Sequence, residues 1–376
     1  MRNFTFKGLF LAAMFMVLGS LAIQAADDGL ITKQITVKLE KAGTLRDKIG
    51  STKRDKITNL KIIGEINGSD WSVIRYMAGR DYYDSESDGK LAILDLSETK
   101  IVSGGGRYLY DDYYRDYFYT HDNELGSRAF YNCSGLTSLS LPSGITSIGW
   151  EAFSGCSGLT SLSLPSGITS IGNEAFSGCS GLTSLSLPSG ITSIGREAFS
   201  GCSGLTSLSL PSGITSIGSE AFSGCSGLTS LSLPSGLTSI DFNAFSGCSG
   251  LTSLSFPSGI TSIGGKAFSG CSGLTSIYVY AEKLPNMESD VFDGCDAKKC
   301  TVYVPKGTYD DYWLSEFGYF ENIVEFEATG INNVITSNDA MELSRYSVNG
   351  QRLSAPTKGL NIVKYSNGSV KKVAVQ

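Results

Sequence analysis

The sequence CSGLTSLSLPSGITSIGWEAFSG, residues 133 to 155, decides the fold. Six copies of this unit follow one another with almost no drift from Cys133 to Gly270, with a fixed 23-residue period. Self-similarity at a period between about 20 and 50 residues is the signature of stacked repeats, in which each unit buries its apolar face against its neighbours. The sequence therefore predicts a solenoid that is framed by less regular segments.

Each copy carries rows of apolar side chains. Three leucines have the spacing L-x-x-L-x-L and alternate with serines: Leu136, Leu139 and Leu141. This alternation predicts a short strand with leucines inward and hydroxyls outward. Pro142 then turns the chain. Ile145 and Ile148 supply a second apolar pair, and residues 151 to 153 favour one helical turn.

These patterns define the predicted fold class. A period of roughly 20 to 29 residues with this leucine spacing is typical of leucine-rich repeats. We expect a β-rich solenoid, a right-handed leucine-rich-repeat stack of 23-residue coils with one parallel sheet on its main face. Short second strands, single helical turns and mixed α/β caps at both ends complete it. The array is expected at residues 133–294, after an N-terminal cap and irregular repeats at residues 27–132.

The pattern LxxLxLPxxIxxIGxxAFxxC is similar to the BspA-type leucine-rich repeat of surface proteins from anaerobic bacteria. The resemblance covers about half of the chain. It departs from the commoner leucine-rich pattern at Gly144, where that pattern carries Asn or Cys, so an asparagine ladder is not expected. The resemblance implies a surface adhesin that contacts host matrix proteins or neighbouring cells.

The amino terminus has the features of an export signal. Two basic residues precede an apolar run, and small residues follow it: Arg2, Lys7, Leu9 to Ile23, Ala25 and Ala26. This order predicts a signal peptide over residues 1–26. A membrane anchor is the alternative, but the run is shorter than the roughly 20 residues needed to span a bilayer. We therefore expect a secreted or cell-surface protein with no transmembrane segment after cleavage, and outer-membrane attachment stays open.

The charge of the chain excludes one class of partner. Without Arg2 and Lys7 of the signal peptide, 28 Lys and Arg stand against 36 Asp and Glu, a net charge of 28 − 36 = −8. Binding to phosphate backbones needs a basic stripe, and the sequence has none. Nucleic acid is therefore not an expected partner. We expect a monomer that binds a protein or glycan ligand on host or neighbouring cells.

The segment before the array predicts an N-terminal cap and two irregular coils. A strand is expected at residues 35–39, where Ile, Val and Leu alternate, and a short helix that Thr44 caps follows it. The leucine spacing of the array returns at residues 57–62 and 91–96. Between them, Asp70 precedes a helical stretch whose large apolar residues are expected to seal the open end of the stack.

An insertion at residues 104–126 interrupts the periodicity with three glycines and then tyrosines interleaved with aspartates. Tyrosine offers a large contact area at low entropy cost, and aspartate offers acceptors for sugar hydroxyls, basic side chains or calcium. We predict a recognition loop, and packing of the tyrosines on the first full coil is the alternative. The candidate ligand-binding residues are Tyr108, Tyr110, Asp111, Asp112, Tyr113, Tyr114, Asp116, Tyr117 and Tyr119.

The serine rows on the main sheet are the second candidate surface. Such stacks bind ligands on the exposed face of this sheet, although serine is also what a solvated strand tolerates. Because the insertion follows the strand that ends near Leu96, it is expected to emerge beside these rows. The candidate residues here are Ser138, Ser140, Ser161 and Ser163.

One position differs in every copy of the repeat. It is occupied in turn by Trp150, Asn173, Arg196, Ser219, Phe242 and Gly265. A buried position could not accept Trp, Arg and Gly in turn, so this row is predicted to face solvent. The pattern is compatible with a row of residues that contact a ligand, and also with substitutions that accumulate without functional constraint at an exposed position.

Seven of the nine cysteines recur once per repeat, from Cys133 to Cys271, at the same inward position. They are predicted to stack as buried thiols, because parallel side-chain vectors fit the geometry of a disulfide poorly. A zinc site needs clustered ligands with His or CxxC spacing, and the sequence has neither. Cys295 and Cys300 differ in spacing, and a local disulfide between them stays open.

The repeat degrades after the array. The stretch VYVPKGTYDDYW resembles the usual end of BspA-type arrays and predicts a C-terminal cap at residues 295–328, with a strand, a helix capped by Thr308 and aromatic residues that roof the last coil. The tail, residues 329–376, has Asn349-Gly350 and Asn367-Gly368 between apolar segments, which predicts two β-hairpins. Its last strands resemble the C-terminal sorting domain of type IX secretion substrates, and a purely structural module is the alternative.

These patterns together predict a non-enzymatic, exported recognition protein. An enzyme such as a glycan hydrolase needs two positioned acids, or a nucleophile with a base. Four carboxylates lie one coil apart, in a uniform row that singles out no site: Glu151, Glu174, Glu197 and Glu220. We therefore assign no catalytic, cofactor-binding or metal-binding residue. A glycan-binding protein and an envelope scaffold, in which the array is only a spacer, are the alternatives.

Overall fold

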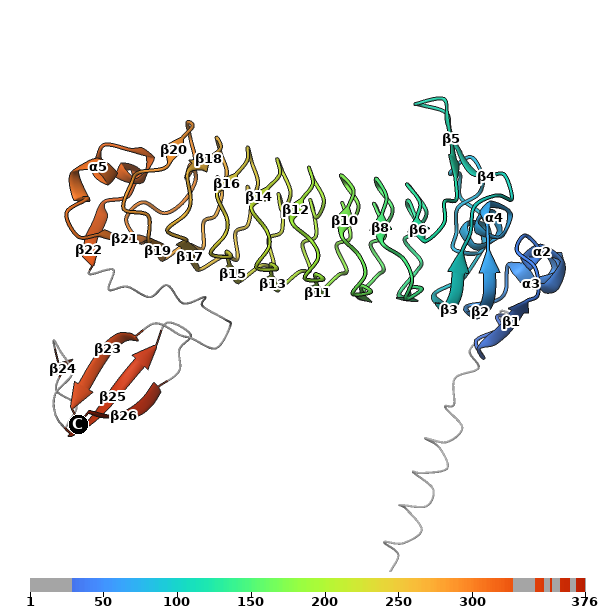
Figure 1. The fold of residues 1–376 in the computed structure, drawn as a ribbon, viewed down its shortest axis with the longest axis horizontal. Helices are drawn as coiled ribbons and strands as arrows, with labels where there is room; N and C mark the ends of the chain where they lie inside the picture. Colours follow the sequence, from blue (N-terminus) through green and yellow to red (C-terminus); the bar gives the residue numbers. More distant parts are fainter. Residues whose placement is uncertain (1–28, 327–341, 348–351, 354–358, 366–369, 376) are drawn as a thin grey trace, which may run out of the picture.

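The computed structural model describes residues 29–326 and four strands of the tail, at residues 342–347, 352–353, 359–365 and 370–375. The signal peptide predicted at residues 1–26 lies outside the described residues. Residues 29–326 form a rod of stacked coils with the N-terminal cap at one end and the C-terminal cap at the other (Figure 1). The predicted solenoid is therefore confirmed.

The main sheet runs along one side of the rod. Its first eight strands are parallel and paired in the order β1 (Ile35–Leu39), β2 (Asn59–Ile66), β3 (Ile93–Ile101), β7 (Ser138–Ser140), β9 (Ser161–Ser163), β11 (Ser184–Ser186), β13 (Ser207–Ser209) and β15 (Ser230–Ser232). Four further parallel strands continue the row: β17 (Ser253–Phe256), β19 (Ser276–Val279), β21 (Thr301–Pro305) and β22 (Asn322–Phe326). The register is exact along the array, so that Leu139 lies beside Leu162 and Ser140 beside Ser163.

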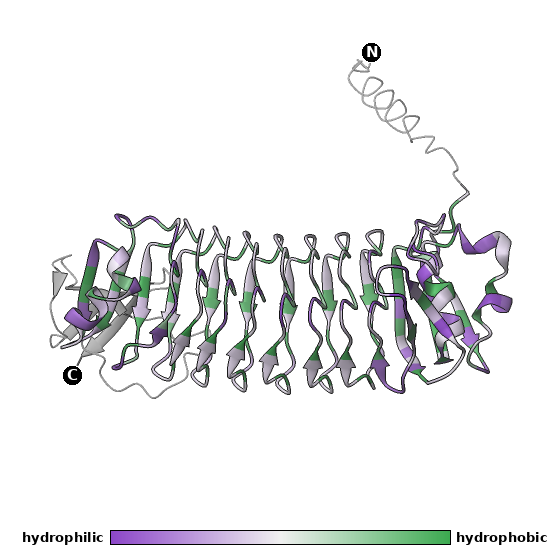
Figure 2. Ribbon diagram, turned by 90° about the horizontal axis from the view of Figure 1, so that it is seen from above, coloured by the Kyte–Doolittle hydropathy of each residue, from purple (hydrophilic) through white to green (hydrophobic). Residues whose placement is uncertain are grey.

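The predicted second strands lie on another side of each coil, and within each sheet they run in one direction (Figure 2). Three of them pair as β6 (Glu124–Leu125), β8 (Ser147–Ile148) and β10 (Ser170–Ile171). Five more pair as β12 (Ser193–Ile194), β14 (Ser216–Ile217), β16 (Ser239–Ile240), β18 (Ser262–Ile263) and β20 (Asn286–Met287). Each of these strands has two residues, and its leucine, isoleucine or methionine points toward the core.

The expected helical turn at residues 151 to 153 is a series of β-turns instead. Glu151 has a φ of 50°, in the left-handed region, and its N–H donates to Asn173 O at 3.0 Å, across to the next coil. The Phe153 N–H likewise donates to Ala175 O at 2.7 Å. An α-helix would use these N–H groups inside its own coil. Their use between coils ties neighbours together on this side of the rod.

Stacked phenylalanine rings run through the core. From Phe130 to Phe268, successive ring centroids are 5.0 to 5.5 Å apart and the planes differ by 2 to 14°. Trp71 meets the first ring edge-on at 5.5 Å. At the other end, Phe292 follows the ladder and packs against Phe317 at 5.2 Å. The two caps therefore close the same aromatic row, as predicted for the ends of a stack.

Polar groups of the repeat also bond from coil to coil. Each threonine at the position of Thr160 donates its hydroxyl to the carbonyl of the equivalent threonine one coil earlier, at 3.0 to 3.4 Å. The buried thiols also bond across coils, and Cys179 Sγ donates to Phe153 O at 3.1 Å. A β-carbon at Gly181 would lie 2.3 Å from Ser157 O, so this position accepts only glycine. These contacts explain why the threonine, cysteine and glycine positions, and not only the leucines, are the same from copy to copy of the repeat.

All nine cysteines are free and buried, including Cys295 and Cys300. Cys295 and Cys300 therefore do not form the disulfide that the sequence had left as a possibility. Burial raises the pKa of the Cys179 thiol to about 12. A thiol with such a pKa is neutral at physiological pH and reacts slowly.

The N-terminal cap packs three helices beside β1 and β2: α2 (Leu45–Ile49), α3 (Ser51–Arg54) and α4 (Gly68–Met77). The predicted cap of α2 is corrected in one respect, because Thr44 makes no capping bond and donates its hydroxyl to Lys41 O instead. Asp70 takes that role from α4, with its carboxylate accepting from Gly43 N at 2.5 Å and Leu45 N at 2.9 Å. One buried acid therefore joins two coils of the cap.

The C-terminal cap contains α5 (Tyr309–Trp313) and the 3-10 helix η1 (Glu316–Tyr319) between β21 and β22. Tyr312 and Phe317 are buried and roof the last coil, and the Tyr312 hydroxyl donates to Ala281 O at 2.7 Å. Tyr309 and Trp313 do not roof it, since both are exposed and stack on each other at 6.0 Å. A five-residue helix buries only one face, and these two side chains lie on the other.

The described part of the tail is one antiparallel sheet in the order β24 (Arg352–Leu353), β23 (Glu342–Ser347), β25 (Gly359–Tyr365) and β26 (Val370–Val375). The pairings of β23 with β24 and of β25 with β26 are the two predicted hairpins. The Asn-Gly turns themselves lie outside the described residues. No helix within the described ranges is long and apolar enough to cross a membrane.

Candidate binding site on the aromatic hairpin

The insertion at residues 104–126 is a β-hairpin, which corrects the predicted loop. Strands β4 (Arg107–Asp111) and β5 (Asp116–Tyr119) pair antiparallel, with Tyr110 opposite Tyr117. Tyrosine is common in strands because its ring packs well on a pleated surface, and alternation over so short a run did not reveal the pairing. We refer to residues 107–119 as the aromatic hairpin. It projects beyond the coils on the side away from β2 and β3 (Figure 1).

A buried ion cluster joins the hairpin to the array. Arg128 pairs with Asp111 of β4 through Nη1 and with Glu151 of the next coil through Nε. The three side chains are 8, 7 and 9% exposed. Asp111 also accepts from Tyr114 N at 2.7 Å. Burial raises the pKa of Glu151, and Arg128 opposes this effect. The cluster therefore fixes the hairpin to two coils at once.

Aromatic rings enclose the Arg128 guanidinium. Its carbon lies 4.4 Å from the ring centroid of Tyr131, 4.7 Å from Trp150 and 5.4 Å from Tyr114. Tyr114 in turn meets Trp150 edge-on at 5.4 Å. An arginine with few water contacts gains from such ring faces, by about 0.5 to 2 kcal/mol in typical cases. This packing is the second attachment of the hairpin to the first full coil.

The start of the hairpin is held by the N-terminal coils. The Tyr108 side chain is buried, and its hydroxyl donates to Ser127 O. Ser69 of α4 donates its hydroxyl to Gly105 O at 2.5 Å. Burial raises the pKa of Tyr108 far above its usual value, so the phenol stays neutral. These two hydrogen bonds hold the start of the hairpin in addition to the ion cluster and the aromatic contacts.

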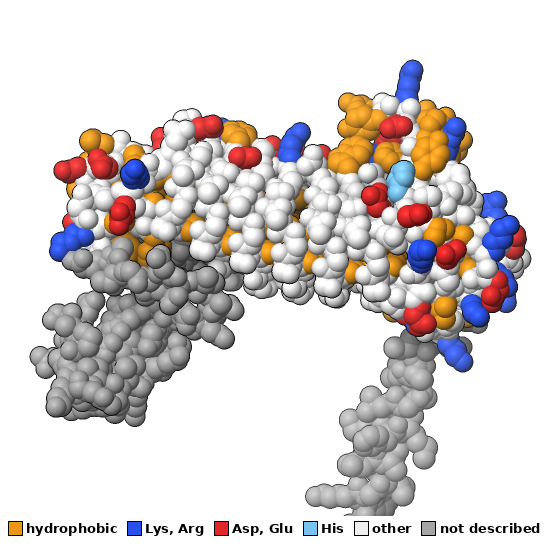
Figure 3. Space-filling model, in the orientation of Figure 1, with side chains coloured by type: hydrophobic (Ala, Val, Ile, Leu, Met, Phe, Trp, Pro, Cys, Tyr) orange, Lys and Arg blue, Asp and Glu red, His pale blue; other side chains and the backbone are white. Residues whose placement is uncertain are grey.

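The far side of the hairpin is open to solvent. We call four tyrosines of the hairpin, together with Tyr83 from the segment after α4, the exposed tyrosine cluster: Tyr83 at 61% exposure, Tyr113 at 86%, Tyr114 at 55%, Tyr117 at 38% and Tyr119 at 45%. Tyr110 connects two of them, with ring centroids 4.8 Å from Tyr117 and 6.1 Å from Tyr83. Arg107 covers the other face of Tyr117 at 3.6 Å and donates to the Tyr119 hydroxyl. Figure 3 shows this projection as a gathering of hydrophobic side chains above an almost uncharged array.

The structure divides the nine candidates on the hairpin into two groups. Tyr113, Tyr114, Tyr117, Tyr119, Asp112 and Asp116 are exposed, and Tyr110 is half-buried. Tyr108 and Asp111 are buried and bonded, which corrects their selection as contact residues. Their side chains bond to Ser127 and Arg128, which lie just before the first full coil. The alternative, in which the tyrosines pack on the first full coil, is right for Tyr114, whose ring meets Trp150 of that coil.

The four serine candidates are exposed on β7 and β9, but they do not lie beside the hairpin: Ser138, Ser140, Ser161 and Ser163. The expectation that the two surfaces adjoin is wrong. The insertion joins β3 of the main sheet to β6 of the second sheet, so it leaves from a different side of its coil. Its anchors Arg128 and Glu151 follow β6 and β8, on that side.

The variable row is only partly exposed. Asn173, Arg196 and Phe242 face solvent, but Trp150 and Ser219 are half-buried and Gly265 is buried. Trp150 is covered because the hairpin packs on it. In the sequence, this contact could have been inferred from the large side chain of Trp150, which stands at the first position of the variable row. Tyr83, Arg128 and Glu151 were missed because no period relates them to the insertion.

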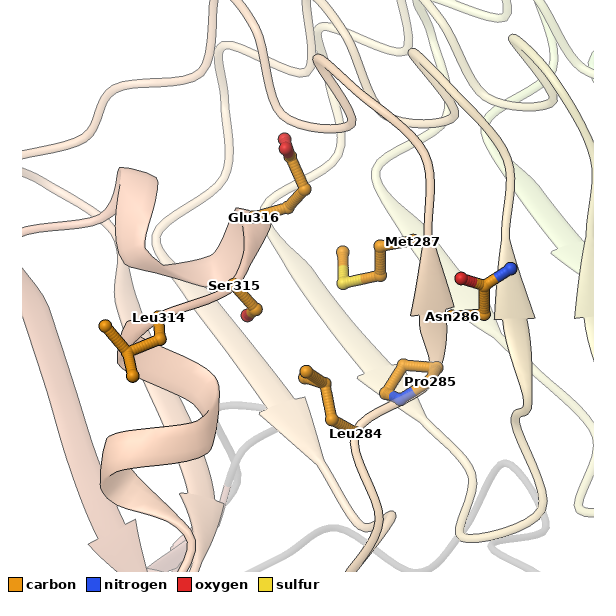
Figure 4. Close-up of a pocket in the computed structure, with 7 residues that line it drawn as sticks. All are labelled: Leu284, Pro285, Asn286, Met287, Leu314, Ser315 and Glu316. Carbon is orange, nitrogen blue, oxygen red and sulfur yellow. The ribbon is translucent and has the colours of Figure 1, made fainter.

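A hollow lies at the C-terminal end of the rod. Its volume is about 630 Å³, and it is lined by Leu284, Pro285, Asn286, Met287, Leu314, Ser315 and Glu316 (Figure 4). The side chains come from β20 with the loop before it, from the segment between α5 and η1, and from Glu316 at the start of η1. Leu314 is 85% exposed, so the hollow is open rather than enclosed. Within the described residues, no group of three His, Cys, Asp or Glu is placed to hold a metal ion.

The stacked coils with their leucine strands define a leucine-rich-repeat protein. A family model described as "BspA type Leucine rich repeat region (6 copies)" matches residues 123–251 and 192–314. The two matches together span residues 123–314, which is half of the chain. The chain therefore belongs to the BspA-type leucine-rich repeat family. No curated protein matches it.

Solved structures of bacterial repeat proteins resemble the chain. A leucine-rich repeat protein from Bacteroides ovatus ATCC 8483 is 27% identical over 55% of this chain and 58% of that chain, with a TM-score of 0.42. The T. pallidum leucine-rich repeat protein is 36% identical over 39% of this chain and 69% of that chain, with a TM-score of 0.37. A leucine rich cell surface protein from Faecalibacterium prausnitzii A2-165 is 20% identical over 80% and 88%, with a TM-score of 0.33. The alignment thus spans less than two thirds of the B. ovatus protein.

Proposed function

We propose that this chain is an exported, non-enzymatic recognition protein, a cell-surface adhesin that binds a protein or glycan ligand on host or neighbouring cells. The observation that carries the proposal is the exposed tyrosine cluster on a hairpin whose base is fixed to the array. Exposed aromatic side chains in a contiguous patch mark interaction sites in soluble proteins. Tyrosine in particular is enriched among the residues that dominate binding hot spots.

The rigid base supports this proposal. Ordering a mobile loop on binding costs about 0.5 to 1.5 kcal/mol for each immobilised side chain. The ion cluster of Asp111, Arg128 and Glu151 has already ordered the hairpin before any ligand arrives. Tyr83 and Tyr117 are held by their contacts with Tyr110 and Arg107. A projecting, pre-organised aromatic surface is the arrangement that long recognition loops use to enter a concave partner.

The serine rows of β7 and β9 form a separate part of the proposal. Ser138, Ser140, Ser161 and Ser163 present hydroxyls without charge on the main sheet. We infer a second, weaker contact surface there for glycan hydroxyls. Because it lies on another side of the rod, it is tested apart from the hairpin.

Export is proposed from the sequence features. The signal peptide at residues 1–26 would direct the chain across the inner membrane. The four-stranded tail sheet is compatible with either a type IX sorting domain or a structural module, and we propose the former from the resemblance of its last strands. Mass spectrometry of the secreted protein would give the new amino terminus and show whether the tail is removed.

The direct test is a binding screen of the chain from residue 27 against matrix proteins and a glycan array. The binding variant is Tyr113→Ser with Tyr117→Ser and Tyr119→Ser, which removes exposed rings only. The matched control is Tyr309→Ser with Trp313→Ser, which removes exposed rings at the other end of the rod. We expect the first variant to lose binding and the control to keep it, with melting temperatures within a few degrees of the wild type.

Survival of binding in the hairpin variant would remove the hairpin as the site. If four Ser→Glu changes on β7 and β9 abolished binding instead, the main sheet would be the recognition surface. If the unaltered chain bound no matrix protein and no glycan, the envelope spacer would be favoured. Turnover of any glycan on the glycan array would show that the protein is an enzyme and would overturn the adhesin proposal.

A further inference from the structure

The two ends of the main sheet are open edges. β1 is the first strand of the sheet, and β22 is the last strand of its continuation. Within residues 29–326, no strand pairs with the outer edge of either one. A strand edge carries a row of backbone N–H and C=O groups that can pair with another chain.

The geometry allows the two edges to pair with each other. Strands in the row from β1 to β22 are parallel where they pair. A second copy that is shifted along the rod without rotation would therefore bring its β1 beside β22 in the parallel direction of the internal coils. Ile35 of β1 and Ile323 of β22 are both half-buried and pack on the core from one side only. Each would gain the neighbour that internal coils have.

The ends also carry opposite charge. Residues 29–58, at the N-terminal end, contain 8 Lys and Arg and 3 Asp and Glu, so their net charge is 8 − 3 = +5. Residues 286–326, at the C-terminal end, contain 3 Lys and 9 Asp and Glu, so their net charge is 3 − 9 = −6. Charged side chains are gathered near the two ends and the hairpin, and the array between them is nearly free of them (Figure 3).

We propose that the N-terminal end of one copy binds the C-terminal end of a second copy, so that rods associate head to tail. This contact is heterologous and does not close, so it extends into a linear chain of rods. Two N-terminal ends, or two C-terminal ends, would bring like charges together, which is unfavourable. The charges therefore select the head-to-tail contact over the other two.

The proposal differs from the monomer expected from the sequence. The sequence did not show that both outer strands belong to one continuous row, nor that their outer edges are free of other strands in the described chain. The proposed head-to-tail contact is also independent of the proposed adhesin function. The hairpin lies on the side of the rod and is not part of either end.

Sedimentation velocity on the chain from residue 27 tests the contact, at a series of concentrations and two salt levels. The screening length falls from about 30 Å at about 10 mM salt to about 6 Å at about 300 mM salt. We expect the average mass to rise with concentration at low salt, and the association constant to fall at least about tenfold at high salt.

Charge-reversal variants locate the contact. The N-terminal variant is Lys38→Glu with Lys41→Glu, and the C-terminal variant is Asp310→Lys with Glu321→Lys. All four residues are exposed. Two control variants make the same changes in net charge on the array: Arg196→Glu with Lys266→Glu, and Glu174→Lys with Glu220→Lys. Lys266 and the two glutamates occupy one position of the repeat, so each replacement there is a residue that the repeat already carries.

Each end variant alone should lose association by at least about tenfold, and the controls should keep it. An equimolar mixture of the two end variants should associate again, because the unchanged C-terminal end of the N-terminal variant then meets the unchanged N-terminal end of the C-terminal variant. A variant that fails to fold would also fail in the mixture, and circular dichroism would show it. Mass that stays constant with concentration at low salt overturns the proposal, as does equal loss in the controls. Binding of the N-terminal end to anionic vesicles without self-association would assign that end to an anionic surface instead.

Discussion

Replacement of Arg128 by Met would test whether the ion cluster holds the aromatic hairpin. The side chains of Arg128, Asp111 and Glu151 are all buried, so removal of the cation leaves two buried carboxylates without their partner. Breaking a buried ion pair in this way costs about 3 to 5 kcal/mol. Asp111 keeps its bond from Tyr114 N, so we expect the lower end of that range. At about 1.4 kcal/mol for each factor of ten, about 3 kcal/mol corresponds to about a hundredfold larger open population.

Hydrogen exchange of β4 and β5 measures this opening directly. The Tyr110 amide, which donates to Tyr82 O at 2.9 Å, should exchange about a hundredfold faster in Arg128→Met, while amides of the central array stay unchanged. The control is Arg128→Met combined with Asp111→Asn and Glu151→Gln. This triple variant removes every charge, so it should recover most of the protection.

The effect should also depend on pH. Burial raises the pKa of Glu151 in the folded protein, and loss of Arg128 would raise it further. An acid with a raised folded pKa favours folding when protonated, and that contribution is lost as pH rises through the folded pKa. The deficit of Arg128→Met should therefore be smaller near pH 5 than near pH 7. Exchange that changes by less than about threefold at neutral pH would refute the role of the cluster.

Three further predictions concern the array. Phe199 lies between Phe176 and Phe222, with ring centroids 5.2 Å away on each side. Phe199→Ala should lower the free energy of unfolding in urea by about 3 to 5 kcal/mol. A decrease below about 1 kcal/mol would contradict a packed ladder. The seven cysteines from Cys133 to Cys271 are buried with raised pKa values, so alkylation near pH 8 should label them only after denaturation, and rapid labelling of the native chain would argue against inward thiols. Deletion of Cys179 to Gly201 should leave a folded protein with a slightly lower melting temperature. Deletion of residues 295–326 should lower the melting temperature further, because it uncovers Phe292. Circular dichroism on heating measures both, and the reverse order of stability would refute nearest-neighbour stacking.

The period of the sequence predicted the array because it places each residue type in a straight row. Leu139, Phe153 and Cys156 therefore needed no knowledge of distant contacts to be assigned to the core. The caps were predicted from local signals, but α4 begins at Gly68 with Asn67 as its cap, so that Asp70 lies within the first turn of the helix and does not precede it. Its further bonds, to Gly43 and Leu45, join segments that are far apart in the sequence and leave no local signal.

The candidate site was predicted less well for the same reason. The tyrosines were identified by composition, which says nothing about which side of a hairpin faces the array. Tyr108 and Asp111 therefore stood among the contact residues although the structure buries both. Arg128 is the centre of the site's base, and in the sequence it is one arginine without a periodic neighbour. Its role depends on Asp111 and Glu151, which belong to other segments of the chain, one before it and one after it.

The near identity of the six coils has a consequence for how this protein can change over generations. A tandem repeat gains or loses whole units when its gene recombines with itself out of register. Here each such event adds or removes one strand spacing, about 4.8 Å of length, and recreates an interface that the rod already contains. The distance between the aromatic hairpin and the C-terminal cap can therefore lengthen or shorten in steps while both ends keep their own structure. The length of the rod is thus inherited separately from the structure of its two ends.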